Sequence, residues 1–127
     1  METINWAKVA KNLRTEIKLY LEESNLQSVV LGISGGIDSA LVATLFRPVC
    51  TALSIPLIMR SISIETNKPD EKERARNMGL SFADDFREID LTELYHITRD
   101  TIEENPEEDK SAKAYKLRVG NIKVRLR

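Results

Sequence analysis

The sequence predicts an α/β domain in which a parallel sheet carries helices on both faces. Segments with helical spacing of apolar residues alternate with short runs rich in β-branched residues, in the order helix, strand, helix, strand, helix, strand, helix. A helical segment lies between each pair of strand-like runs, as the crossover between parallel strands requires. The 127 residues suffice for one core. We therefore expect a single domain over residues 1–127.

Composition excludes several classes of protein. Hydrophobic residues make up 42% of the chain, charged residues make up 31%, and the net charge is −1. This profile is typical of a globular protein and not of a disordered tail or a nucleic-acid coat. No apolar run approaches the roughly 20 residues of a membrane span, and the start lacks the apolar core of a secretory signal. We expect a cytoplasmic protein without a membrane or nucleic-acid partner.

The first half of the chain predicts three elements. Residues 1–23 form an amphipathic helix, because apolar residues recur at intervals near four: Ile4, Val9, Leu13, Ile17 and Tyr20 or Leu21. The run 29–33 is short, apolar and β-branched, which indicates a strand buried on both faces. A helix follows over 40–46 and reaches Pro48, whose ring and missing N–H should kink or end it.

The second half predicts two strands and two further helices. The apolar stretch 57–64 indicates a strand, and 69–78 a helix, with proline and two acids in its first turn and Gly79 placed to cap its end. A short strand over 86–89 precedes a helix over 91–102 that begins with capping-box spacing.

The end of the chain separates its charges. We expect a solvated loop over 103–113, where acidic residues gather. From Lys110 to Arg127 there are seven basic residues and no acidic one, and a helical pattern continues through 121–127. This segment predicts either contact with an anionic ligand or a solvated helix face.

The turn after the first strand, Ser34-Gly35-Gly36-Ile37-Asp38-Ser39, is the strongest functional signal. Ligands of open α/β sheets bind at the carboxyl ends of the strands, where a helix N-terminus attracts anions. Two glycines allow backbone conformations in which successive N–H groups surround a phosphate, and the serines add hydroxyl donors. Asp38 fits beside phosphates if Mg²⁺ lies between them. The alternative is a plain glycine turn in which Asp38 complements the helix dipole.

This turn resembles the SGGxDS loop of the ATP pyrophosphatases, the PP-loop superfamily, whose members split ATP into AMP and pyrophosphate while adenylating a substrate. Within that superfamily the chain resembles the N-terminal part of the ammonia-dependent NAD synthetases. The resemblance is carried by LGISGGIDSAL around the loop, by the stretch Glu65–Glu71 and by the ending Arg118–Arg127. It implies a Rossmann-like fold, similar to the adenine nucleotide alpha hydrolases.

The resemblance also implies an activity. A C–N ligase of this family uses ATP to adenylate the carboxylate of nicotinic acid adenine dinucleotide, and ammonia then displaces AMP to give NAD. The implied ATP site consists of Gly32, Ile33, Ser34, Gly35, Gly36, Ile37, Asp38 and Ser39. Asp38 would bind Mg²⁺, and Arg125 corresponds to a family arginine that contacts the deamido-dinucleotide. The family implies a homodimer, and no residue here is assigned as catalytic.

The family supplies a second acidic Mg²⁺ ligand and further ATP contacts beyond the position of Arg127, so we expect a truncated sheet and a longer native protein. Two alternatives stay open. Another PP-loop enzyme would modify tRNA or serve an amidotransferase, although the chain has no CxxC pair and no net positive charge. The other is a non-catalytic nucleotide-binding fragment. Free ammonia and glutamine both remain possible nitrogen sources.

Three residues outside the loop motif have side chains that often act in functional sites, and we consider each of them. We expect His96 to be structural or solvent-facing, and Cys50 to be a small buried side chain, because no histidine neighbours it in the pattern. Glu65 could line the ATP side of the cleft, and a capping or solvent role explains it equally well.

Overall fold

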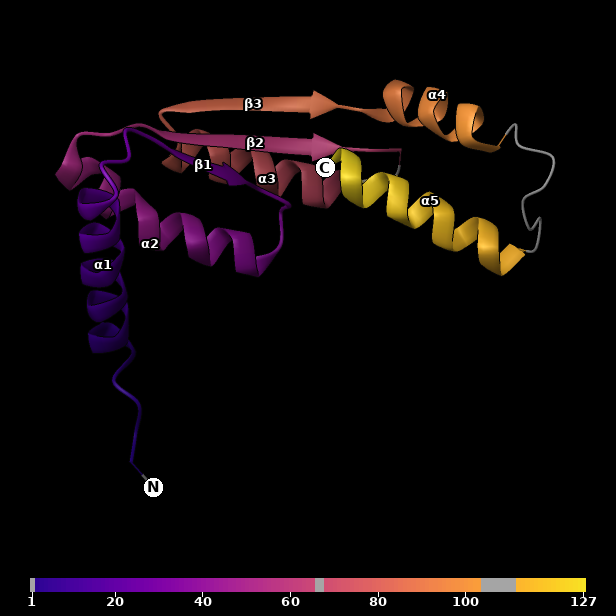
Figure 1. The fold of residues 1–127 in the computed structure, drawn as a ribbon. Coiled ribbons are helices and arrows are strands. Elements are labelled where there is room, and N and C mark those ends of the chain that lie inside the picture. The colour runs from indigo at the N-terminus through magenta and orange to yellow at the C-terminus, as the bar shows by residue number, and fades with distance from the viewer. Residues whose placement is uncertain (1, 66–67, 104–111) are drawn as a thin grey trace.

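The computed structural model describes residues 2–65, 68–103 and 112–127. Three parallel strands lie in the order β1-β2-β3, with Val29 opposite Leu57 and Ile58 opposite Asp85 (Figure 1). The predicted Rossmann-like fold class with a parallel sheet is confirmed, but among the described residues the helices that pack on the sheet, α2 and α3, cover one face and not both as expected. The elements in chain order are α1 (Trp6–Glu23), β1 (Val29–Gly32), α2 (Ile37–Leu53), β2 (Leu57–Ser63), α3 (Pro69–Phe82), β3 (Asp85–Asp90), α4 (Thr92–Glu103) and α5 (Ala112–Leu126).

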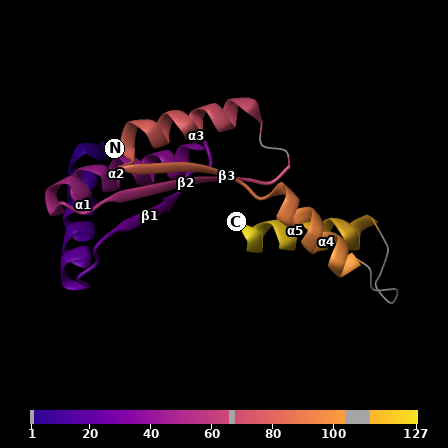
Figure 2. The ribbon, with the colours of Figure 1, turned by 90° about the horizontal axis from the view of Figure 1, so that it is seen from above.

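The main core lies between the sheet and the helices α2 and α3. These helices pack against each other and cover the same face, since each β-α-β crossover runs in the same direction along the sheet (Figure 2). Alternate residues of β2 point into this core, and the buried cluster consists of Ile33, Ala43, Cys50, Leu57, Met59 and Ala75. Parallel pairing places the carboxyl ends of all three strands at one edge, where the loops that follow them meet.

Strand β1 is not buried on both faces, as its unbroken apolar sequence had suggested. Val30 is 68% exposed, whereas Ile33, just beyond the strand, is 3% exposed. β1 lies at an edge of the sheet, and α2 covers only the face that carries Val29 and Leu31. An apolar run indicates that a strand is able to be buried on both faces. Whether both faces are buried depends on which helices and strands pack against that strand.

Helix α2 continues through Pro48 to Leu53, so of the two expected effects of the proline, a kink or an end of the helix, the end does not occur. Proline cannot donate a hydrogen bond to the carbonyl four residues earlier, which is that of Thr44. Arg14 of α1 supplies the missing donor, with its Nη2 2.9 Å from the Thr44 oxygen. A side chain from a distant helix therefore offsets the break in the hydrogen-bond ladder.

Helix α3 runs past Gly79 to Phe82, so the prediction that Gly79 caps the helix is wrong. Gly79 is buried in the last turns of the helix, and a Cβ there would lie 2.1 Å from a ring carbon of Phe86 on β3. The glycine is needed for close approach between helix and strand, not for a left-handed cap.

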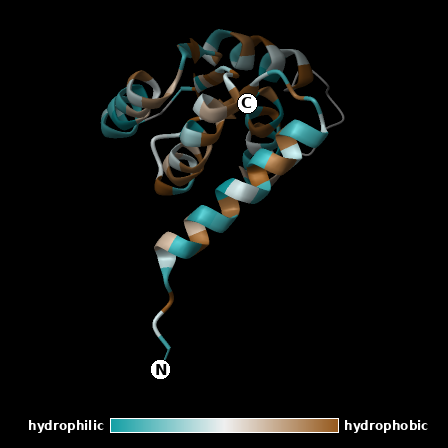
Figure 3. Ribbon diagram, turned by 90° about the vertical axis from the view of Figure 1, so that its left-hand side faces the viewer, coloured by the Kyte–Doolittle hydropathy of each residue, from teal (hydrophilic) through white to brown (hydrophobic). Residues whose placement is uncertain are grey.

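The amphipathic N-terminal helix is present, but it begins at Trp6 with Asn5 as its N-cap and not at the first residue, and most of its apolar row is exposed. Leu21 is 4% exposed, whereas Leu13 is 46% and Tyr20 65% exposed. Figure 3 shows α1 leading away from the body of the molecule toward the N-terminus, with apolar and polar residues interspersed along it.

Helices α4 and α5 pack against each other beyond the carboxyl edge of the sheet (Figure 2). A second buried cluster of Ile64, Tyr95 and Ile122 joins them to the end of β2. The helical pattern predicted for the end of the chain is confirmed as part of α5. Residues 104–111, which hold most of the predicted acidic loop, lie outside the described residues.

Candidate functional site

The glycine turn connects β1 to the N-terminus of α2 with a left-handed residue at Gly35, whose φ is 84°. Gly36 is the N-cap of α2, with a φ of −85° and no side-chain capping hydrogen bond. The first N–H groups of an α-helix have no partners within the helix, and the helix dipole gives this end a partial positive charge. The structure therefore presents an uncapped helix N-terminus at the carboxyl edge of the sheet.

Two serine hydroxyls face each other across the turn. The Ser34 and Ser39 oxygens lie 3.1 Å apart, and Ser39 Oγ also accepts from the Ser34 N–H at 3.2 Å. The Gly36 N–H donates to Ser34 Oγ at 3.2 Å. These contacts hold the turn as a closed ring, in which the Ser34 and Gly36 N–H groups donate to the serine oxygens and both hydroxyls lie beside the start of α2.

The start of α3 supports the turn from one side. Arg74 Nε donates to the Gly35 carbonyl at 2.9 Å. A Cβ on Gly35 would lie 2.2 Å from the carbonyl oxygen of Glu71, whereas a Cβ on Gly36 would meet only Ser34 Oγ, at 3.3 Å. We had expected both glycines to need conformations that a Cβ forbids, and the structure limits that need to Gly35.

Cavities border the turn on two sides. One of about 270 Å³ opens between β1, β2 and the end of α5, and its lining includes Ser34, Arg60 and Arg127. Another of about 430 Å³ lies between the start of α2 and α3, and its lining includes Gly36 and Arg74. A ligand can therefore reach the turn from the sheet edge or from between the helices.

Asp38 lies in the first turn of α2 and is exposed. Within residues 2–65, 68–103 and 112–127, no group of three or more His, Cys, Asp or Glu side chains gathers as a metal cluster. A single exposed carboxylate beside this glycine turn suits Mg²⁺, which keeps several waters and is often held by one carboxylate together with substrate phosphates. Asp38 thus fits a shared Mg²⁺ site and not an all-protein cage.

The basic end of the chain reaches the sheet edge through Arg127. Arg127 lines the cavity beside Ser34, while Arg125 is exposed in the last turn of α5 and is not part of that lining. The sequence resemblance singled out Arg125 and missed Arg127. Only the direction of α5, which brings its end back over the strands, could have revealed this position.

The sequence also missed Arg60 and Arg74, because single arginines on a strand and a helix carry no motif. Arg60 forms an ion pair with β3, where its Nη2 lies 2.7 Å from Asp85 Oδ2.

Cys50 is fully buried, and desolvation raises the pKa of its thiol, which confirms the prediction that it is a packing residue.

Comparison with known protein families identifies the family to which the chain belongs. A family model described as NAD synthase matches residues 9–127. The chain belongs to the NAD synthase family. An NH(3)-dependent NAD(+) synthetase of Finegoldia magna is 37% identical over 98% of this chain and 46% of its own length. The corresponding protein of Carboxydothermus hydrogenoformans is 30% identical over 98% of this chain and 48% of its own length. The chain thus spans about half the length of these curated relatives.

Solved structures of NAD synthetases share the fold. An NAD+ synthetase from Burkholderia pseudomallei superposes with a TM-score of 0.81 at 20% identity, over 97% of this chain and 54% of that one. An NH3-dependent NAD synthetase from Campylobacter jejuni, in complex with the nitrate ion, superposes with a TM-score of 0.72 at 24% identity, over 97% of this chain and 48% of that one. At these identities the likeness establishes the fold.

Proposed function

We propose that this chain carries the nucleotide-binding part of an ammonia-dependent NAD synthetase. The reaction is amide formation on nicotinic acid adenine dinucleotide, with ATP split into AMP and pyrophosphate. The observation that supports it most strongly is the SGGIDS turn, whose facing serine hydroxyls adjoin an uncapped helix N-terminus at the carboxyl edge of a parallel sheet. The names of the two curated relatives agree with this activity.

In this proposal the turn binds the phosphates of ATP. Amide groups at the start of α2 and the hydroxyls of Ser34 and Ser39 stabilise the charge that develops on pyrophosphate when the nicotinate carboxylate attacks the α-phosphate. Mg²⁺ held by Asp38 would neutralise part of the phosphate charge. Ammonia then attacks the acyl carbon of the adenylate, and AMP leaves with the carboxylate oxygen.

The basic C-terminal segment has a role in the same proposal. The dinucleotide substrate carries its own pyrophosphate, and Arg125 brings a cation to the last turn of α5. Charge-assisted hydrogen bonds from arginine to phosphate are strong and often bidentate. We assign the deamido-dinucleotide contact to Arg125.

We also propose a homodimer, which the exposed apolar row of α1 supports. Among the described residues, no helix is both long and apolar enough to cross a membrane.

The reaction is tested by measuring AMP and pyrophosphate with protein expressed from its intact gene. We expect release that depends on nicotinic acid adenine dinucleotide, on Mg²⁺ and on either ammonium or glutamine, and parallel assays with each nitrogen donor identify the source. Product release with a tRNA substrate in place of the dinucleotide would support another PP-loop reaction instead. ATP binding without product under any of these conditions would support a non-catalytic nucleotide-binding protein.

Asp38→Asn tests the metal assignment in the same assay. Losing the carboxylate should lower pyrophosphate release by about 100-fold or more, since interactions that stabilise transition-state charge contribute effects of that size. Glu93→Gln is a matched control, because Glu93 is also an exposed acid in the first turn of a helix at this edge. Unchanged release in Asp38→Asn, or an equal loss in both variants, would contradict the role of Asp38.

A further inference from the structure

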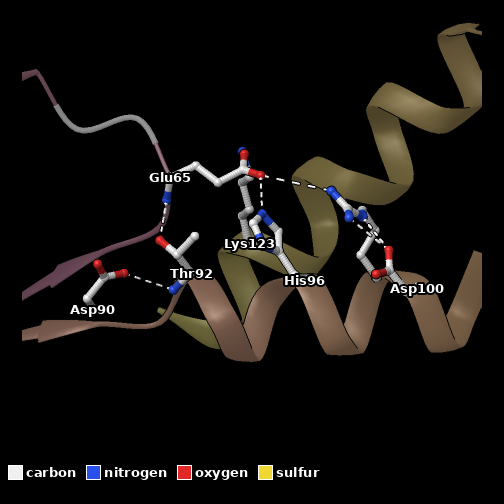
Figure 4. Close-up of polar contacts among 7 residues, drawn as sticks. Glu65, Asp90, Thr92, His96, Asp100 and Lys123 are labelled. Carbon is white, nitrogen blue, oxygen red and sulfur yellow. Dashed lines mark hydrogen bonds and ion pairs between the residues drawn. The ribbon is translucent and has the colours of Figure 1, made fainter.

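Glu65 lies two residues beyond the carboxyl end of β2 and has a left-handed conformation, with a φ of 60°. This conformation is uncommon for residues other than glycine and draws attention to what holds it. The Glu65 N–H donates to Thr92 Oγ1 at 2.7 Å, and the Thr92 N–H donates to Asp90 Oδ1 at 2.9 Å. The backbone of Glu65 is therefore fixed to the start of α4 (Figure 4).

The carboxylate of Glu65 contacts nitrogen atoms of side chains from two helices. Lys123 Nζ of α5 lies 2.8 Å from Oε2, and His96 Nε2 of α4 lies 2.9 Å from Oε1. Arg99 Nη1 lies 4.0 Å from the same Oε1. The hydrogen bonds from Lys123 and His96 lower the pKa of the Glu65 carboxyl, so it is ionised at neutral pH. Only 27% of the Glu65 side chain and 23% of the Lys123 side chain is exposed, which limits screening by solvent.

The contact between Glu65 and Lys123 ties α5 to the sheet edge. The apolar contact of α5 at this point is made by Ile122 against Ile64 and Tyr95, with Val119 and Leu126 of α5 packed against the same cluster, and the ion pair adds a polar contact beside it. Lys123 Nζ also lies 4.9 Å from the centre of the Tyr95 ring, so its position is defined on two sides. Lys123 and Ile122 occupy the last turns of α5, next to the end that carries Arg127.

We propose that Glu65 is a positioning residue: by holding Lys123 it fixes the end of α5, so that Arg127 faces the phosphates of a nucleotide bound at the SGGIDS turn. Lys123 is close enough to Arg127 to set its position, because Arg127 follows Lys123 by four residues, about one helical turn. Arg127 lines the cavity that Ser34 lines, and a phosphate there meets both a hydroxyl and a guanidinium. The role of Arg127 rests on the proposed nucleotide-binding function, whereas the attachment of α5 by Glu65 does not.

Hydrogen exchange of the ligand-free protein tests the attachment. In Glu65→Gln the residue keeps its size but loses its charge, and amides in the last turns of α5 should exchange about ten-fold faster while those of α3 are unchanged. Lys123→Met, which removes the other partner, should give the same pattern. Glu93→Gln is the matched control, an exposed acid in the first turn of α4. Unchanged exchange in α5 in both variants would overturn the attachment.

Calorimetric titration with Mg·ATP tests the consequence. We expect Arg127→Met to weaken binding about ten-fold, the effect of one hydrogen bond to a charged group, and Glu65→Gln to weaken it by up to the same factor. The double variant should bind no worse than Arg127→Met, because Glu65 acts only through that residue. Multiplied losses in the double variant, or full binding by Glu65→Gln, would overturn the positioning role. No ATP binding by the wild type would overturn the proposed function and the role of Arg127, with α5 exchange still deciding the attachment.

Discussion

Replacing Gly35 with alanine tests whether the glycine turn is built as the structure indicates. At a φ of 84° an alanine loses about 1–2 kcal/mol relative to its preferred conformations. Its Cβ would lie 2.2 Å from the Glu71 carbonyl oxygen, so α3 and the turn would have to separate by about 1.2 Å to reach an ordinary 3.4 Å contact. Overpacking of this kind costs about 1–3 kcal/mol. The two contributions give a loss of about 2–5 kcal/mol in the free energy of unfolding.

Gly36→Ala is the matched control for this prediction. Its φ of −85° suits any residue, and its Cβ would lie 3.3 Å from Ser34 Oγ, a contact that a shift of a few tenths of an ångström in one side chain relieves. We expect a change within about 0.5 kcal/mol. Urea unfolding followed by circular dichroism measures both variants, and a titration with Mg·ATP measures whether the turn still binds phosphate. Equal stabilities of the two variants, or a loss below about 1 kcal/mol in Gly35→Ala, would refute the reasoning from φ and close approach.

Two further predictions concern the support of the sheet. Gly79→Ala should destabilise the protein by about 1 kcal/mol, because the clash with the Phe86 ring exceeds the gain in helix propensity. In a Phe86→Leu background the same substitution should cause no loss of stability. A stabilising effect of Gly79→Ala in the wild-type background would contradict the observed packing. Asp84→Asn should lower stability by up to about 1 kcal/mol, since Asp84 accepts hydrogen bonds from the Leu57 N–H and from Arg47. These bonds lower the pKa of the Asp84 carboxyl below its ordinary 3.8, so its contribution is present above that pH and is lost as the pH falls below it. Unfolding curves from pH 7 to pH 2 should therefore converge for wild type and Asp84→Asn, and a constant difference would contradict the assignment.

The sequence by itself determined the order of the elements and the place of the glycine turn between β1 and α2. These depend on local properties: the period of apolar residues, the φ freedom of glycine, and the preference of proline and acids for a helix start. For the same reason Gly35 could be recognised as part of a functional turn before any contact was known. The SGGIDS motif is contiguous, so it can be recognised from the sequence without knowledge of contacts between distant segments.

Tertiary structure decided what depends on neighbours that lie far along the chain. Pro48 remains inside a helix because Arg14 replaces the lost donor, and Gly79 lies inside a helix because Phe86 packs where a Cβ would be. Val30 is exposed because no strand or helix of the described residues covers its face. Glu65 and Lys123 are 58 residues apart and pair only after β2, α4 and α5 meet. Local sequence sets which conformations are available to each segment, and the free energy of packing between distant segments selects among them.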